Sequence, residues 1–167
     1  MSEIEGRVWK FGDDVDTDAI VPGKYLILLD PAEVAGHVME GIRPGFADLV
    51  EPGDIIVGGA NFGTGSSRDP AVKGLQSAGI QAIIAESFAR IFFRNCINAG
   101  LAPVECTEAG KIEEGQQVQI DVLEGKVTVV DTGAVLEAVP LPAEIASILD
   151  AGGLVEFVKG QLEAEQS

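Results

Sequence analysis

The chain has 167 residues, of which 46% are hydrophobic, and its 27 acidic and 11 basic residues give a formal net charge of −16. This length suits one domain with a sizeable core, so residues 1–167 are expected to form a single domain. The negative charge argues against nucleic-acid binding, and no apolar run is long enough to span a membrane. No signal-peptide pattern begins the chain and its two cysteines fit a reducing compartment, so we expect a cytoplasmic protein.

The first third of the chain predicts a strand, an acidic loop and a helix. Residues 7–11 alternate as a strand does, and the stretch GDDVDTD at 12–18 is typical of a loop. Asp30 is placed to cap a helix that begins at Pro31 and ends near Met39.

Apolar strands and helices alternate in the middle of the chain. Ser87 is expected to cap a helix that Gly100 ends, and an earlier helix is expected from about Pro70 to Gly79. Helical spacing predicts that three apolar residues of the later helix share one face: Phe88, Ile91 and Phe92. Buried strands are predicted at 54–59, 80–87 and 101–106.

The last third of the chain predicts a hairpin followed by helical and apolar segments. Residues 117–123 and 126–131 flank Glu124-Gly125 in a hairpin pattern. A short helix is expected at 143–149, and the polar tail 160–167 is expected to fray. Strands separated by helices favour parallel pairing, whereas a hairpin is antiparallel. The predicted fold class is therefore α/β, with a mixed, barrel-like sheet flanked by helices.

The acidic loop has the residue spacing of a calcium-binding loop in Asp14, Asp16 and Asp18, but the glycine and glutamate that such a loop needs are replaced by Ala19 and Tyr25. Calcium binding is therefore rejected. Two interpretations stay open: a solvated acidic turn, or an orienting role for the Thr17-Asp18 pair, with Asp18 partly buried beside the apolar residues that follow it.

The stretch NFGTGSSRDP at 61–70 matches neither a dinucleotide fingerprint nor a Walker loop nor a hydrolase nucleophile elbow. The backbone N–H groups of Gly63, Thr64 and Gly65 can approach a ligand closely, and the start of a helix beside Arg68 favours a carboxylate or an alkoxide. A purely structural glycine turn is the alternative.

The remaining reactive side chains give weaker signals. Arg90 and Arg94 lie one helical turn apart, which is typical of a solvated helix face. The lone histidine, His37, cannot build a histidine-rich metal site and is not expected to be a catalytic base. Two cysteines, Cys96 and Cys106, are too few to hold an iron–sulfur cluster, and we expect no metal site in this chain.

Three stretches together carry a family resemblance: GDDVDTDAIVPGKYL at 12–26, NFGTGSSRDPAV at 61–72 and SFARIFFRNCINAGL at 87–101. In order and spacing they resemble the small subunits of isopropylmalate isomerases, also called 3-isopropylmalate dehydratases. This family is related to homoaconitase small subunits and to the swivelling C-terminal domain of aconitase. The resemblance extends over about residues 6–160, and it implies a single swivelling domain.

The resemblance implies a role in a heteromeric hydro-lyase. A separate large subunit would carry a 4Fe-4S cluster, this chain would hold no cofactor, and the substrate would be a small dicarboxylate. The reaction would convert 2-isopropylmalate to 3-isopropylmalate by dehydration and rehydration, as in leucine biosynthesis. Ser66 would act as the base, Arg68 would bind a substrate carboxylate, and Ser67 would donate a hydrogen bond. A homo-oligomer of the isolated chain is also open.

Substrate choice is expected to depend on the loop at 24–30, where Ile27 and Leu28 follow a Tyr-Leu pair. Homoaconitase-like members carry an arginine there, which suits an extra carboxylate, whereas an apolar wall favours a methyl or isopropyl group. Alternatively, Ile27 packs in the core. Thr64 and the Asp69-Pro70 pair depart from the common family pattern. A homoaconitase, a dimethylmalate dehydratase and a non-catalytic anion-binding module therefore stay open, as does whether the loop becomes ordered only with the large subunit.

Overall fold

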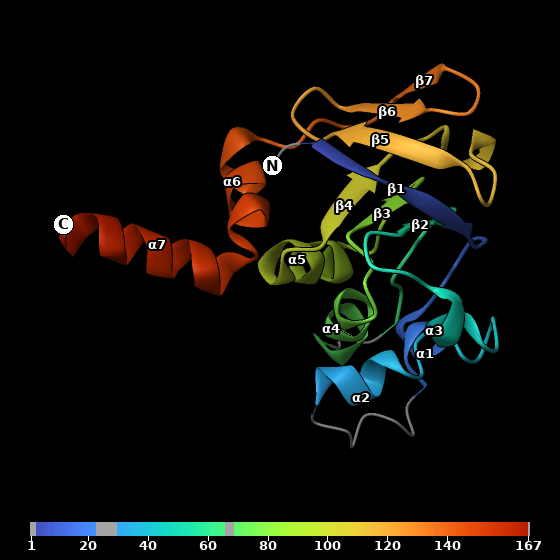
Figure 1. Ribbon diagram of the computed structural model, residues 1–167, viewed down its shortest axis with the longest axis horizontal. Helices are drawn as coiled ribbons and strands as arrows, with labels where there is room; N and C mark the ends of the chain where they lie inside the picture. Colours follow the sequence, from blue (N-terminus) through green and yellow to red (C-terminus); the bar gives the residue numbers. More distant parts are fainter. Residues whose placement is uncertain (1–2, 23–29, 66–68, 167) are drawn as a thin grey trace.

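The computed structural model describes residues 3–22, 30–65 and 69–166. Strands and helices follow each other along the chain, with most helices in the first two thirds and a hairpin near the end (Figure 1). In chain order these are β1 (Glu3–Lys10), α1 (Thr17–Ile20), α2 (Pro31–Ala35), α3 (Phe46–Leu49), β2 (Ile55–Val57), α4 (Asp69–Ser77), β3 (Ala82–Ala85), α5 (Arg90–Ala99), β4 (Ala102–Glu105), the 3-10 helix η2 (Ala109–Lys111), β5 (Gln117–Asp121), β6 (Lys126–Val129), β7 (Ala134–Glu137), α6 (Ala143–Ala151) and α7 (Leu154–Gln166).

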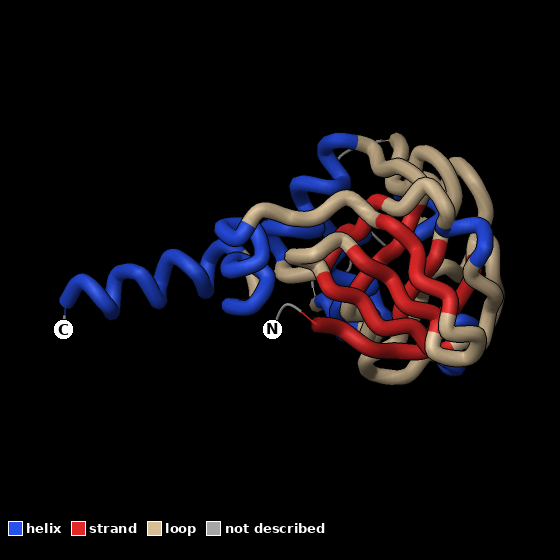
Figure 2. The backbone as a smooth tube through the Cα atoms, turned by 90° about the horizontal axis from the view of Figure 1, so that it is seen from above, coloured by secondary structure: helices blue, strands red, loops and turns tan. Residues whose placement is uncertain are grey.

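The strands form one sheet of seven in the order β4-β3-β2-β1-β5-β6-β7. β1 pairs in parallel with β2 and antiparallel with β5, so the parallel and antiparallel halves share this strand. The sheet curls into a half-barrel (Figure 2), and just beyond β7 the N–H of Val139 donates to the carbonyl of Glu105 in β4 at 2.8 Å, so the two ends of the strand order approach each other. The predicted mixed, barrel-like sheet is confirmed.

Two hydrophobic cores cover the two faces of the parallel strands. Alternate side chains point to opposite faces, so Ile56 joins a core with helices α1 to α5, whereas Ile55 and Val57 lie inside the curl of the sheet. The inner core also receives Val118 and Val127 from the antiparallel strands. Burial on both faces explains why the parallel strands read as continuous apolar runs in the sequence.

The helix boundaries confirm some sequence predictions and correct others. The Asp30 carboxylate accepts from the N–H of Ala32 as the predicted N-cap, but α2 ends at Ala35 and the residues up to 40 form turns. The predicted Ser87 cap is wrong, because α5 begins at Arg90 and the Ser87 hydroxyl accepts from another loop instead.

Two further predictions concern the later helices. Phe92 is buried while Ile91 is exposed, so these residues do not share a face as predicted, whereas Gly100 ends α5 in the left-handed conformation as expected. Helix α7 continues through residues 160–166, and fraying of this tail in solution stays a prediction. None of the helices within the described ranges is long and apolar enough to cross a membrane.

A polar network around Trp9 joins segments that are far apart in the sequence. The indole N–H donates to the buried Asp54 carboxylate at 2.7 Å, and the Arg7 and Arg43 guanidinium groups lie 5.1 and 4.8 Å from the ring centroid. Arg43 also forms a bidentate pair with Glu114, and this hydrogen bonding lowers the pKa of Glu114. The network ties the turns after α2 and the start of β2 to the centre of the sheet.

Candidate functional site

The glycine loop, residues 58–65, follows the carboxyl end of β2, the edge at which ligands commonly bind in α/β sheets. On one side it runs beside residues 11–17, which leave β1 in the same direction. Backbone hydrogen bonds continue the pairing of the two strands into these loops. They run from Phe11 N to Val57 O (2.7 Å), Gly59 N to Gly12 O (3.0 Å), Asp14 N to Ala60 O (2.8 Å), Gly63 N to Val15 O (2.7 Å) and Thr17 N to Thr64 O (2.9 Å).

The other side of the glycine loop is held by the residues that follow β3. The N–H of Asn61 donates to the Ser87 hydroxyl at 2.9 Å, and the N–H of Phe62 donates to the Ser87 carbonyl at 3.0 Å. The Phe62 carbonyl accepts from the N–H of Ala89, at the start of α5. The loop is therefore fixed on both sides by backbone contacts, as a preorganised ligand site requires.

Three glycines of the loop, Gly58, Gly59 and Gly63, have no room for a side chain. A Cβ atom at Gly63, whose φ is +84°, would lie 2.1 Å from Cγ of Phe92. At Gly59 it would lie 1.8 Å from a carboxylate oxygen of Asp13, and this oxygen accepts from the N–H of Ala60 at 2.8 Å. Gly65, with φ +97°, packs beside the Thr17 hydroxyl. These positions require glycine because of close contacts and left-handed backbone.

The acidic loop ends in a short helix rather than continuing as a loop through Asp18. Asp16 caps α1, because its carboxylate accepts from the N–H of Ala19 at 2.7 Å. Thr17 is buried, with 3% of its surface exposed, and lies directly beside the glycine loop. The expected partial burial of Asp18 is wrong: its side chain is exposed because it lies on the outer face of α1. An orienting role for Asp18 stays a proposal.

Five predicted site residues lie outside the described part of the chain: Ser66, Ser67 and Arg68, with Ile27 and Leu28 in the 24–30 loop. The described residues Gly63, Thr64 and Gly65 lead directly into the first three. Helix α4 begins at Asp69, one residue before the predicted start, so this serine-arginine stretch immediately precedes a helix of nine residues.

The other candidate groups do not belong to this loop. Within residues 3–22, 30–65 and 69–166, no cluster of three or more His, Cys, Asp or Glu side chains could hold a metal ion. Burial raises the pKa of both the Cys96 and Cys106 thiols. His37 contacts Glu40 at 2.9 Å, and Arg90 and Arg94 are exposed on α5.

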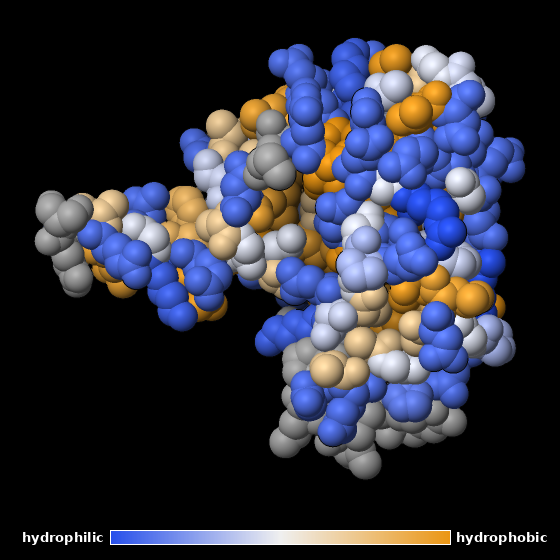
Figure 3. All heavy atoms as spheres, in the orientation of Figure 1, coloured by the Kyte–Doolittle hydropathy of each residue, from blue (hydrophilic) through white to orange (hydrophobic). Residues whose placement is uncertain are grey.

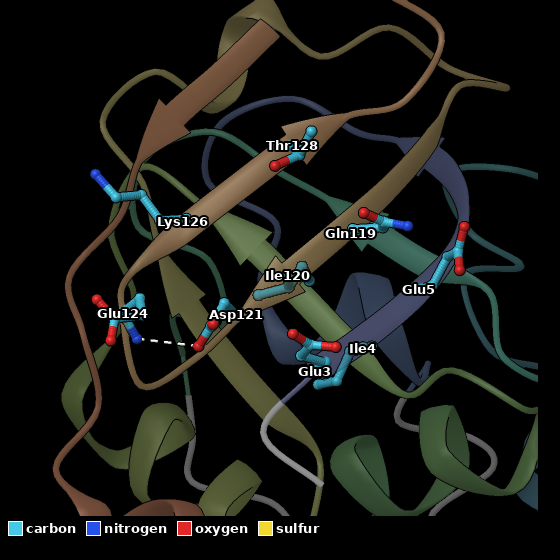
Figure 4. A pocket seen from close by; sticks show the side chains of 9 residues that line it. All are labelled: Glu3, Ile4, Glu5, Gln119, Ile120, Asp121, Glu124, Lys126 and Thr128. Carbon is cyan, nitrogen blue, oxygen red and sulfur yellow. Dashed lines mark hydrogen bonds between the residues drawn. The ribbon is translucent and has the colours of Figure 1, made fainter. Parts of the chain in front are cut away.

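A depression of about 550 Å³ lies on the outer face of β1, β5 and β6 (Figure 4). Carboxylates dominate its lining, and Asp121 is engaged by the backbone N–H of Glu124 at 3.0 Å. The lining ammonium, Lys126, is ion-paired with Glu137. This depression would repel a dicarboxylate, so its chemistry does not suit the predicted substrate class. Its lining residues are Glu3, Ile4, Glu5, Gln119, Ile120, Asp121, Glu124, Lys126 and Thr128.

Comparison with known proteins identifies the family. Residues 50–109 match the aconitase C-terminal domain family. The chain is 51% identical over 158 residues to the 3-isopropylmalate dehydratase small subunit 1 of Archaeoglobus fulgidus, and the match covers 95% of this chain and 98% of the relative. The chain belongs to the 3-isopropylmalate dehydratase small subunit family. The family predicted from the three sequence stretches is confirmed.

Two further comparisons with this dehydratase family extend over nearly the whole chain. The isopropylmalate/citramalate isomerase small subunit of Methanocaldococcus jannaschii is 50% identical over 166 residues, which cover 99% of each chain. A crystal structure of 3-isopropylmalate dehydratase from the same organism aligns with a TM-score of 0.91 and 44% identity, again over 99% of both chains. This structural match supports the fold over 99% of the chain.

Three residues that position the glycine loop were not identified from the sequence: Asp13, Ser87 as an acceptor, and Phe92 as the ring against which Gly63 packs. Each acts across a long sequence separation, and residue type alone does not reveal such contacts. The available signal was that Gly59 ends one predicted strand and Asp13 follows another, and that the carboxyl ends of these two strands lie at one edge of the sheet.

Proposed function

We propose that this chain is the small subunit of a heteromeric hydro-lyase that converts 2-isopropylmalate to 3-isopropylmalate by dehydration and rehydration. The observation that carries the proposal is the match to 3-isopropylmalate dehydratase small subunits at about half identity over nearly the whole chain. A large-subunit partner follows from the same relationship, since these relatives are named as small subunits.

Within this proposal, Ser66 removes a proton from the carbon next to a substrate carboxylate. A serine hydroxyl acts as a base only if its alkoxide is stabilised by N–H donors and positive charge. Support comes from the two-sided anchoring of the glycine loop and from the position of Ser66 and Arg68 in the sequence just before α4, because the N-terminus of a helix favours negative charge. Arg68 is proposed to pair with a substrate carboxylate, and Ser67 to donate a hydrogen bond.

The reaction proposed here balances without a net oxidant. Loss of the proton and of the neighbouring hydroxyl releases water and leaves an unsaturated acid. Addition of water in the opposite sense places the hydroxyl on the carbon that lost the proton and returns a proton to the other carbon. Ser66 accounts for the proton at the first carbon, and Arg68 holds the carboxylate through both halves of the reaction. Thr17 and Asp18 are proposed to orient these groups from the start of α1, which is hydrogen-bonded to the glycine loop through the N–H of Thr17.

A 4Fe-4S cluster does not fit the described residues of this chain. Those residues offer no group of metal-binding side chains, and both cysteine thiols are buried within the two cores. We therefore assign the cluster to the large subunit.

A second substrate is favoured by one comparison: the Methanocaldococcus jannaschii relative is named for both isopropylmalate and citramalate. Both acids carry an alkyl group that an apolar wall could contact, so Ile27 and Leu28 are proposed as the residues that contact it. A tricarboxylate substrate is the alternative if that wall is absent, and dimethylmalate, whose methyl groups the same wall would also favour, is a further alternative. A non-catalytic anion-binding module is the alternative if no substrate reacts.

The test is an anaerobic assay of the chain with its cluster-loaded large subunit, following the ultraviolet absorbance of the unsaturated acid. We expect turnover of isopropylmalate, and we expect Ser66→Ala to lower turnover by roughly 10²–10⁴-fold without loss of the complex. The matched control is Ser77→Ala at an exposed position near the end of α4, which should leave turnover unchanged. Full activity of Ser66→Ala would refute the base assignment, and no turnover of any tested acid would favour the binding module.

A further inference from the structure

Helix α7 projects from the body of the protein as an arm (Figures 1 and 2). Its base is closely packed against the end of α5. A Cβ atom at Gly153 would lie 2.6 Å from the carbonyl oxygen of Asn98, and one at Gly100 would lie 2.6 Å from the carbonyl carbon of Gly152. All three glycines have positive φ. Because this joint is tightly packed, the direction of the arm is set by the fold.

The arm is amphipathic although it extends into solvent. Its aliphatic side chains are between 39% and 65% exposed, and they occupy positions spaced by three or four residues. At about 100° per residue these positions fall within about 100° of the helix circumference, which defines one apolar stripe. Figure 3 shows apolar surface along the arm. The members of the stripe are Leu154, Val155, Val158 and Leu162.

An isolated helix of 13 residues is only marginally stable in water, and Gly160 in its interior lowers its helix propensity further. Within the part of the chain that the structure describes, α7 contacts mainly α6 and α5, near the joint. The stripe therefore favours burial against another surface, since burial of an amphipathic face is the main source of helix stability in proteins.

We propose that the stripe on α7 pairs with the same stripe of a second copy of this chain. Leu154 precedes Val158 by four residues and Leu162 follows it by four, so the pattern is symmetric about Val158. In an antiparallel pair with its two-fold axis at Val158, Leu154 of each copy lies opposite Leu162 of the other. Such self-complementarity is the requirement for a two-fold symmetric interface.

The charges on the arm are compatible with this pairing. The chain has a net charge of −16, so a second copy can approach only where carboxylates avoid the centre of the contact. Glu156 and Glu163 lie away from the stripe, and Lys159 pairs with Glu156 at 3.8 Å. Glu165 lies in line with the stripe beyond Leu162, where the antiparallel pair places it near the N-terminus of the other copy's α7, a helix end that favours negative charge. Antiparallel packing also places opposite helix dipole ends together.

The area of the contact sets the expected strength. A stable interface usually buries about 800 Å² on each partner, and paired helices of about 20 Å length bury less. We therefore expect a dimer that forms with increasing concentration rather than a permanent one.

The first test is sedimentation velocity of the full chain over a wide concentration range. The wild-type mass should rise toward two chains as concentration increases. Val158→Glu should weaken dimerisation by at least roughly tenfold, because it places a carboxylate and its symmetry mate at the two-fold axis. The matched control is Gly160→Glu, which introduces the same residue on the opposite face, where a Cβ atom meets nothing within 4 Å. This control should dimerise as the wild type does.

A second test uses cross-linking at the proposed axis. Packed helices lie roughly 8–10 Å apart, wider than a disulfide spans, so a short bismaleimide is the suitable reagent. Val158→Cys should cross-link to a second copy, and Gly160→Cys should not. Two results would overturn the proposal directly: a wild-type chain that stays monomeric at the highest concentration, or a dimer that Val158→Glu leaves intact. If the wild-type chain is monomeric and Val158→Glu weakens binding of the large subunit, the proposal is also overturned, because the stripe then contacts that partner.

Discussion

Gly63 packs against the ring of Phe92, and replacing it with alanine tests how the glycine loop is supported. Two separate costs are expected. The left-handed backbone, with φ of +84°, costs an alanine about 1–2 kcal/mol. The added Cβ atom would lie 2.1 Å from Cγ of Phe92, and overpacking of this kind costs typically about 1–3 kcal/mol more.

Gly133 provides the matched comparison, because its φ is +77° and a Cβ atom there meets nothing within 4 Å. Both substitutions stabilise by restricting the unfolded chain, by about 0.4–1 kcal/mol, so this effect cancels between them. We therefore expect Gly63→Ala to lower the free energy of unfolding by about 1–3 kcal/mol more than Gly133→Ala does.

Urea unfolding of both variants, with matching slopes, measures this difference. The double-mutant cycle with Phe92→Ala then isolates the contact: in that background the extra cost of Gly63→Ala should largely disappear. Equal destabilisation by Gly63→Ala and Gly133→Ala, or an extra cost that persists without the Phe92 ring, would refute the argument that this ring seats the loop.

Three further predictions concern the body of the protein. Trp9→Phe removes the N–H that donates a hydrogen bond to the buried Asp54 carboxylate. It should lower the free energy of unfolding in urea by about 1–3 kcal/mol, and an unchanged midpoint would contradict this. The pKa of Glu114 is lowered by Arg43, so its contribution to stability is present above the unfolded pKa of about 4.3 and is lost as pH falls through the folded value. The free energy of unfolding should therefore fall less steeply toward acid pH in Glu114→Gln than in the wild type. An identical slope would count against the Arg43–Glu114 pair. Burial raises the pKa of the two cysteine thiols, so iodoacetamide should modify them slowly in the folded chain and rapidly in urea, as mass spectrometry can measure; rapid labelling of the folded chain would disprove their burial.

The fold was largely predictable because its strands and helices carry local signals. Apolar runs gave the parallel strands, the Asp30 cap and Gly100 gave two helix termini, and the Glu124-Gly125 turn gave the hairpin. The Ser87 cap failed because a competing contact in the folded chain, the N–H of Asn61, takes its hydroxyl. Such tertiary contacts override local preferences and leave no local pattern.

The position of the candidate site was predictable from the sequence, but the contacts that hold the glycine loop in place were not. The glycine loop was expected at the carboxyl end of a strand, and it follows β2. Its two-sided anchoring depends on residues that meet only after the sheet forms, such as Asp13 against Gly59. Asp18 was expected to be partly buried because an apolar run follows it, but α1 turns that run inward and leaves the carboxylate outside.

The central position of β1 has a consequence for the order of folding. This strand is made before both of its neighbours in the sheet: Val8 pairs with Ile55 on one side, and Gly6 pairs with Val118 on the other. During synthesis, the parallel half can therefore assemble on β1 well before the antiparallel half emerges. Until β5 arrives, one edge of β1 exposes unpaired backbone groups, which are a template for pairing with other chains. Loss of β1 would separate the two halves of the sheet, so the eight residues of this strand hold the parallel and antiparallel halves together.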